Sequence, residues 1–251
     1  MLHHLLLILA GIAGGFINTF AAGGSVVQLP AMIALGLHPM IANTTNHVPV
    51  LLGFLAAIWR FHRSGTMPWR DGFKISMPMV LGSLGGALTA SYISDRVTGY
   101  VLLASLLLAL VLMVAKPDRW LHQISEQSEL TIGPLVLFLS FLVGFWAGLI
   151  IIGSGVFILL TLVLAANFRI PQANAIKVLT IGIATLLSVI VFGLKGQIAW
   201  AWAIPVSIGS ISGSLIGAKL VTIQSTGKWV YMLILITLMT EIVHLGSGVF
   251  H

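Results

Sequence analysis

The sequence predicts an all-α, polytopic membrane protein built from two inverted repeats of about five membrane segments each. Only 7% of the 251 residues are charged, against about 25% in a soluble domain, and the mean hydropathy is +1.09. Apolar stretches long enough to span about 30 Å of hydrocarbon recur from end to end. Short Gly- and Ser-rich motifs also recur in the same order in both halves. We therefore expect one integral membrane domain, residues 1–251, with short broken helices at a central site.

The net charge of +6 does not indicate a nucleic-acid surface. The basic residues stand singly or in short groups between apolar runs, which is typical of cytoplasmic loops. The chain has no cysteine, which excludes disulfides and thiolate metal sites, and no nucleotide-binding motif. We expect no cofactor, no metal and no nucleic acid. The expected partners are the lipid bilayer and a small anionic substrate, and a homodimer stays an open alternative.

The two halves align over most of their length. GGFINTFAAGGS (residues 14–25) matches VGFWAGLIIIGS (residues 143–154), and PMVLGSLGG matches PVSIGSISG. Chance matching of small residues is the alternative, but the order is constant and the offset stays between 127 (78 to 205) and 131 (43 to 174). Duplication is therefore favoured, with repeat 1 at residues 2–115, a linker at 116–130 and repeat 2 at 131–246. The paired residues include Gly24 with Gly153, Ser25 with Ser154, Asn43 with Asn174, Gly65 with Gly196 and Trp69 with Trp200.

Each unit should contain five segments in order. An apolar segment is followed by a short one after the glycines and by three longer ones. The expected ranges are 2–21, 25–36, 41–60, 72–93 and 98–115 in the first unit, and 131–151, 154–166, 172–193, 199–219 and 227–246 in the second.

The short segments decide the topology. If they turn back as re-entrant hairpins, each unit has four crossings and both units share one orientation. If they cross, each unit has five and the units are inverted. Five crossings place ten of the twelve Lys and Arg residues on one side, with only Arg96 and Lys195 opposite, whereas four crossings divide them seven to five. Because basic residues favour cytoplasmic loops, we predict ten crossings with both termini outside.

The glycines before the short segments are the first candidate site. Backbone at membrane depth can leave the helix only where protein or a watery cavity satisfies its polar groups. Helices that restart at Ser25 and Ser154 present unpaired N–H groups and a positive dipole end, a suitable site for an anion. Close helix packing is the alternative role for such small residues, and we favour it for GSLGG and GSISG. The turn residues in this site are Gly23, Gly24, Ser25, Gly153 and Ser154.

A second polar group opens the segment after each short helix. Five consecutive polar side chains are too many for one helix cap, so some must point into the bundle and can hydrogen-bond an oxyanion or a partner helix. Lys177 supplies either a fixed charge at the site or an anchor at the cytoplasmic interface, and the role of His47 is equally open. The substrate-binding candidates here are Asn43, Thr44, Thr45, Asn46 and His47 in the first half, and Asn174 and Lys177 in the second.

These motifs resemble the TauE/SafE sulfite exporter family. The resemblance rests on AAGGSVVQLPAMIALGLHP, ANTTN and GTMPW, followed by IGSGVFILLTLVLAANFRIPQANAIKV and GQIAW, and it extends over nearly the whole chain. It implies transport of small sulfur-containing anions such as sulfite or sulfonates across the bacterial inner membrane, with the central site at the two glycine turns and the Asn-rich helix starts. This chain departs from a symmetric pattern, because AAGGS has two glycines before its serine and IIGSG has one.

The leading hypothesis is therefore a secondary transporter, not an enzyme, that exports such anions by alternating access. An intramembrane serine protease that uses Ser154 and His244 is the enzyme alternative, and an anion channel would use the same site residues. Glu241 and His244 are spaced to share a helix face, where they could relay protons or lie at the membrane interface.

Overall fold

The structure is a computed structural model that describes residues 2–89, 107–108, 110–114, 131–149, 153–223 and 227–249. Within these ranges the regular elements are all helices, as the fold class predicts. The expected segment 98–115 falls largely outside the described residues, and the linker 116–130 does so entirely.

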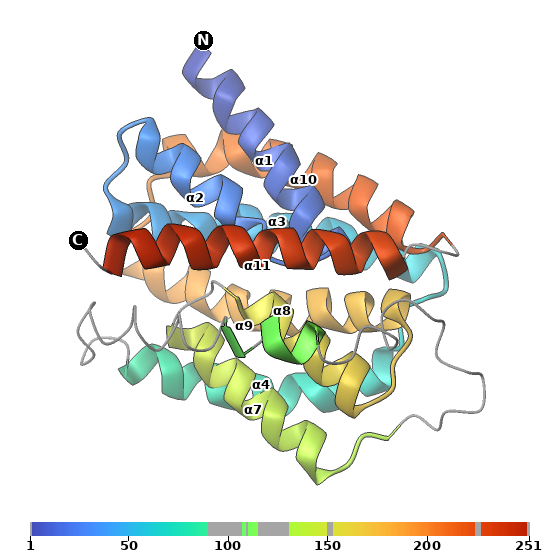
Figure 1. Cartoon of the computed structure of the whole chain (residues 1–251). Coiled ribbons are helices and arrows are strands. Elements are labelled where there is room, and N and C mark those ends of the chain that lie inside the picture. Colours follow the sequence, from blue (N-terminus) through green and yellow to red (C-terminus); the bar gives the residue numbers. More distant parts are fainter. Residues whose placement is uncertain are drawn as a thin grey trace.

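The described helices follow the expected order (Figure 1). Most ends lie within a few residues of the predicted ranges. The first half contains α1 (Leu2–Phe20), α2 (Ser25–Ala34), α3 (Pro39–Arg63) and α4 (Trp69–Thr89). The second contains α7 (Pro134–Leu149), α8 (Ser154–Leu160) with a π-helical turn (Thr161–Ala165), α9 (Ile170–Leu194), α10 (Trp200–Val221) and α11 (Gly227–Val249).

The local sequence explains where the two longest helices begin and end. Both α3 and α9 have 25 residues and a proline in the first two positions, where the missing N–H costs no helix bond. Gly65 and Gly196 follow their C-terminal ends with φ of 70° and 66°, a left-handed conformation that glycine adopts without steric cost. The two helices are thus bounded by the same signals, with the glycines 131 positions apart and the prolines 132.

Four of the described helices are long and apolar enough to cross a membrane. These stretches are Leu2–Phe20, Ile41–Arg63, Ile170–Leu194 and Trp200–Val221. The chain is accordingly a membrane protein.

Glycines bring helices of the two halves into close contact. A Cβ atom at Gly213 of α10 would lie 2.0 Å from the carbonyl oxygen of Ile12 in α1. One at Gly82 of α4 would lie 2.1 Å from the carbonyl oxygen of Phe141 in α7. Each helix pair can approach this closely only because these positions lack side chains. The packing role expected for GSLGG and GSISG is confirmed.

The contacts of α3 fix its direction relative to the second half. The backbone N–H of Ala199 donates to Thr45, and Ser210 donates to the carbonyl of Pro49, so α3 and α10 run parallel. The rings of His47 and Phe192 lie 5.0 Å apart near the start of α3 and the end of α9. A Cβ at Gly182, in the middle of α9, would lie 3.7 Å from Cβ of Phe54, further along α3. The helices α3 and α9 therefore run antiparallel, as Figure 1 also shows.

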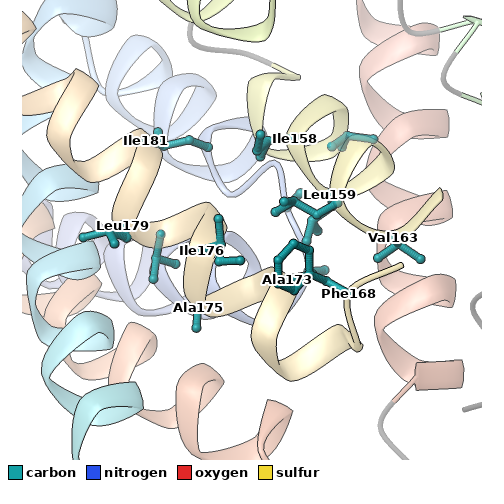
Figure 2. Close-up of a cluster of buried hydrophobic side chains, with 14 of the residues drawn as sticks. Ile158, Leu159, Val163, Phe168, Ala173, Ala175, Ile176, Leu179 and Ile181 are labelled. Atoms are coloured by element: carbon teal, nitrogen blue, oxygen red, sulfur yellow. The ribbon is translucent and has the colours of Figure 1, made fainter. Parts of the chain in front are cut away.

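The main hydrophobic core lies where α8 packs against the first half of α9. Figure 2 shows Ile158 and Leu159 of α8 facing Ile176, with Phe168 closing the cluster beside the start of α9. All four side chains are fully buried. Because interiors of this kind are close-packed, the core holds α8 and the turn before it in a fixed place.

Candidate functional site

The two glycine turns meet at one small internal cavity. It has a volume of about 20 Å³ and lies between the middle of α3 and the middle of α9. Four of the twelve predicted site residues line it: Gly23, Ser25, Gly153 and Ser154. The rest of the lining is Asn18, Val50, Phe54, Gly155 and Ile181.

The turns have matching backbone geometry, but their pairing is shifted by one residue from the sequence alignment. Gly23 and Gly153 have φ of 87° and 78°. The carbonyl of Gly23 accepts from the N–H of Val26 at 3.0 Å, and that of Gly153 accepts from Val156 at 2.9 Å. Gly23 is therefore the geometric counterpart of Gly153. The pairing of Gly24 with Gly153 holds for the helix starts, because each directly precedes a helix that begins at a serine. It does not hold for φ, because Gly24 has the right-handed helical conformation.

Gly24 instead lets the start of α2 pack against α1. A Cβ atom at this position would lie 1.9 Å from the carbonyl oxygen of Gly14. The N–H of Gly24 donates to Oδ1 of Asn18 at 2.7 Å. Gly24 is absent from the lining of the cavity, so its contribution to any site is made through the position of α2.

Asn18 lines the cavity and was not among the predicted site residues. It is 8% exposed. Because a backbone N–H can only donate, the bond from Gly24 fixes Oδ1 on the side of the turn and leaves Nδ2 on the other. Nδ2 has no hydrogen-bond partner among the described residues. An asparagine within the first apolar segment was the available signal, since polar side chains at membrane depth mark functional positions.

The start of α2 is surrounded by further amide groups. Nδ2 of Asn46 donates to Oγ of Ser25 at 3.0 Å, while Oδ1 of Asn46 has no partner among the described residues. Gln28, one turn into α2, is fully buried, and neither its oxygen nor its nitrogen is paired within the described chain. Buried polar groups are normally satisfied, so this cluster has spare hydrogen-bonding capacity for a ligand or for water.

Lys177 reaches from α9 to the end of α1. Its ammonium donates to the backbone carbonyl of Thr19 at 3.3 Å, to that of Ala21, and to Oδ1 of Asn174 at 2.6 Å. The side chain is fully buried, so the interface position considered for it is wrong. A cation at a helix C-terminus stabilises the last carbonyls of that helix. With three protein acceptors, the ammonium could contact a bound anion directly only by giving up one of these bonds.

The remaining polar residues of α3 make contacts elsewhere. Thr44 donates to the carbonyl of Gln197, and Thr45 accepts from Ala199 at 3.0 Å, so both connect α3 to the segment before α10. Nδ1 of His47 lies 2.9 Å from the carbonyl oxygen of Asn43. Asn43 and Thr44 line a second, larger cavity of about 270 Å³. The side chains of Glu241 and His244 are outside the described part of the chain.

The arrangement is suited to binding an oxyanion. Two helix starts and Asn18 line the small cavity, and none of its lining residues is Asp or Glu. Backbone N–H groups, amides and hydroxyls are the donors that bind oxyanions in proteins. Within the described residues no group of three or more His, Cys, Asp or Glu is placed to hold a metal ion.

Comparison with known proteins identifies a family of membrane transporters. The sulfite exporter TauE/SafE family model matches residues 7–242. A probable membrane transporter protein of Haemophilus influenzae is 30% identical over 98% of this chain and 96% of its own length. One from Sinorhizobium, ORF9, is 30% identical over 86% and 83%, and YfcA of Escherichia coli is 26% identical over 86% and 79%. No solved structure matches. With its family model matched over nearly the whole chain, the protein belongs to the TauE/SafE sulfite exporter family of membrane transporters.

Proposed function

We propose that the protein exports small sulfur-containing or related organic anions, such as sulfite or sulfonates, across the bacterial inner membrane. The observation that carries this proposal is the cavity where both glycine turns meet, whose lining includes Asn18, an asparagine with an Nδ2 that is buried and unpaired among the described residues. Helix starts alone are common in proteins. An additional buried donor with no partner is the feature that indicates a ligand.

The chemistry of the cavity favours an anion. The N-terminal ends of α2 and α8 carry partial positive charge, and α8 continues into the π-helical turn as one apolar stretch, Ser154–Ala165. Lys177 adds a full positive charge behind the wall of the cavity, since its Cδ would lie 3.8 Å from a Cβ at Gly155, which lines the cavity. Charge of one sign around a dry cavity raises its preference for the opposite sign.

We infer that the two units are inverted, with five crossings each. If the short helices turned back, both units would share an orientation and the counterparts α3 and α9 would run parallel. They run antiparallel, and α3 runs parallel to α10 instead. These directions support the inverted arrangement.

The basic residues support an orientation in the membrane. Those at the end of α3, the start of α9 and the end of α10 belong to one face, because α3 runs parallel to α10 and antiparallel to α9. Arg63, Arg169 and Lys219 lie at these three ends, whereas Lys195 follows the opposite end of α9. By the positive-inside rule the first face is cytoplasmic. The inside-negative potential then assists outward movement of an anion by about 2.3 kcal/mol per charge for each 100 mV.

A carrier suits the structure better than a channel. The central cavity has a volume of only about 20 Å³, which holds one or two water molecules. Exchange of labelled substrate for unlabelled substrate across proteoliposome membranes would identify a carrier, whereas flux that does not depend on substrate opposite would identify a channel.

Asn18→Asp tests the site directly. The substitution keeps an oxygen acceptor for the N–H of Gly24 but replaces the donor Nδ2 by a charged oxygen. We expect at least a tenfold loss of sulfite affinity in calorimetric titration of the purified protein, about 1.4 kcal/mol. Gln172→Glu, at the surface end of α9, adds a carboxylate away from the cavity and should bind like the wild type. Unchanged sulfite affinity in Asn18→Asp would show that the anion does not bind in this cavity.

A further inference from the structure

A second cavity lies on the side where α3 begins and α9 ends. Its volume is about 270 Å³, more than ten times that of the central cavity. Asn43 contributes from α3, Ser83 from α4, Leu149 from α7, and Lys195 follows the end of α9. The cavity can therefore hold a whole small organic molecule, which the central cavity cannot do in this conformation.

One face of α9 borders both cavities. Ile181 lines the central cavity, and Ala184, Ser188, Val191 and Lys195 line the larger one. Successive members are three or four positions apart, the spacing of residues along one helix face. The stripe spans 15 residues, and its 14 steps of 1.5 Å give a length of about 21 Å. A solute that follows this face of α9 passes from the surface at Lys195 to the level of the glycine turns.

The opposite end of α9 offers no such route among the described residues. There the fully buried side chains of Leu159, Phe168 and Ile176 pack together (Figure 2), and Lys177 is bonded to the end of α1. The described structure is thus open toward the face of Lys195 and closed toward the other. An opening on one face at a time is what alternating access requires.

The lining of the larger cavity indicates the kind of solute. Lys195 is exposed at its rim, and no Asp or Glu belongs to the lining. Amide and hydroxyl groups from Asn43, Ser83 and Ser188 alternate with apolar walls that include Phe192. A cation with a few polar groups on an apolar surface suits an anion that carries a short hydrocarbon part.

We propose that this cavity is a second anion site, a vestibule that holds an organic anion such as an alkanesulfonate on the face of Lys195, before or after it occupies the central site. The proposal rests on the transport function proposed above and adds a second site and the path. Lys195 attracts the anion, and the stripe on α9 guides it.

The absence of native cysteine allows a direct test. Ser188→Cys places the only thiol in the vestibule, and Ser212→Cys is a matched control on the exposed surface of α10. Both serines donate to the carbonyl four residues earlier. We would compare an anionic, sulfonate-bearing methanethiosulfonate reagent with a cationic trimethylammonium one on purified protein. Ser188→Cys should react at least about tenfold faster than Ser212→Cys, since a thiol facing lipid or detergent does not ionise.

Two further measurements complete the test. Adding Lys195→Gln to Ser188→Cys should lower the rate with the anionic reagent about threefold or more and leave the cationic rate unchanged or higher. Ethanesulfonate at millimolar concentration should slow the modification of Ser188→Cys. Equal reactivity of the two cysteines, indifference to Lys195→Gln, or no protection by ethanesulfonate would each overturn the vestibule. Sulfite affinity that still depends on Asn18 would in that case leave the proposed transport function standing.

Discussion

The two halves of the molecule build similar turns and hold them with different chemistry. In the first half, neutral amides surround the start of α2, and Asn46 bonds Ser25. Lys177 occupies the corresponding position of α9, 131 residues later, and it bonds carbonyls at the end of α1. The first half therefore retains spare hydrogen-bonding capacity in the described amides around the start of α2. The second half supplies a lysine whose ammonium is bonded to carbonyls of the first half. The comparison teaches that two halves with similar turns need not give two equal half-sites.

The largest expected effect comes from making the first turn resemble the second. With Gly23 paired to Gly153, Gly24 corresponds to Ser154, where a side chain is accommodated. Gly24→Ser would place Cβ 1.9 Å from the backbone oxygen of Gly14, so helices must shift. We expect a loss of about 3 kcal/mol or more in the free energy of unfolding, at the upper end of overpacking effects, measured by thermal unfolding in detergent.

Gly85→Ser is the control for that substitution. A Cβ at Gly85 would lie 3.5 Å from the ring of Phe145, an ordinary contact distance, so little stability should be lost. If Gly24→Ser were as stable as Gly85→Ser, the first turn would tolerate a side chain and the difference between the halves would lie elsewhere.

The sequence was sufficient for the all-helical class and for the order of the described segments, because hydropathy and small-residue motifs act locally and recur. It was less informative about the site. Gly24 and Gly23 are adjacent and identical, and only φ separates the turn residue from the packing residue. In the sequence, Asn18 is a single polar residue in an apolar helix. Only the fold places it at the cavity where both glycine turns meet. Two of the three partners of Lys177, the carbonyls of Thr19 and Ala21, lie more than 150 positions away, and no local pattern encodes such a contact.

The second-largest expected effect comes from removing the charge of Lys177, which distinguishes the two halves. Lys177→Met keeps an unbranched side chain but leaves the carbonyls of Thr19 and Ala21 and Oδ1 of Asn174 without the ammonium. Unsatisfied buried acceptors cost about 1–3 kcal/mol each, and removing a desolvated charge offsets part of this. We expect a net loss of about 2 kcal/mol in thermal unfolding. Lys195→Met removes an exposed lysine and should change stability by less than about 0.5 kcal/mol, and equal stability of the two variants would show that the Lys177 bonds contribute nothing.

The smallest effect concerns the contact between Thr45 and the segment before α10. The N–H of Ala199 donates to Thr45 at 3.0 Å. At the corresponding positions of the other half, 131 residues apart, the chain has Ile176 and Pro68, and proline has no N–H that needs an acceptor. Each half is thus consistent within itself, since a hydroxyl occurs where an N–H must be satisfied and an apolar side chain where there is none.

Thr45→Val should therefore cost about 1 kcal/mol of unfolding free energy, because it leaves the N–H of Ala199 unpaired. In an Ala199→Pro background the same substitution should cost almost nothing, since the donor is already gone. Ala199 has φ of −83°, which is close to the range of proline. The double-mutant cycle isolates the hydrogen bond from the loss of the hydroxyl. If Thr45→Val still lowered the free energy of unfolding in the Ala199→Pro background, the loss would come from the packing of α3. The two halves would then not differ in this hydrogen bond.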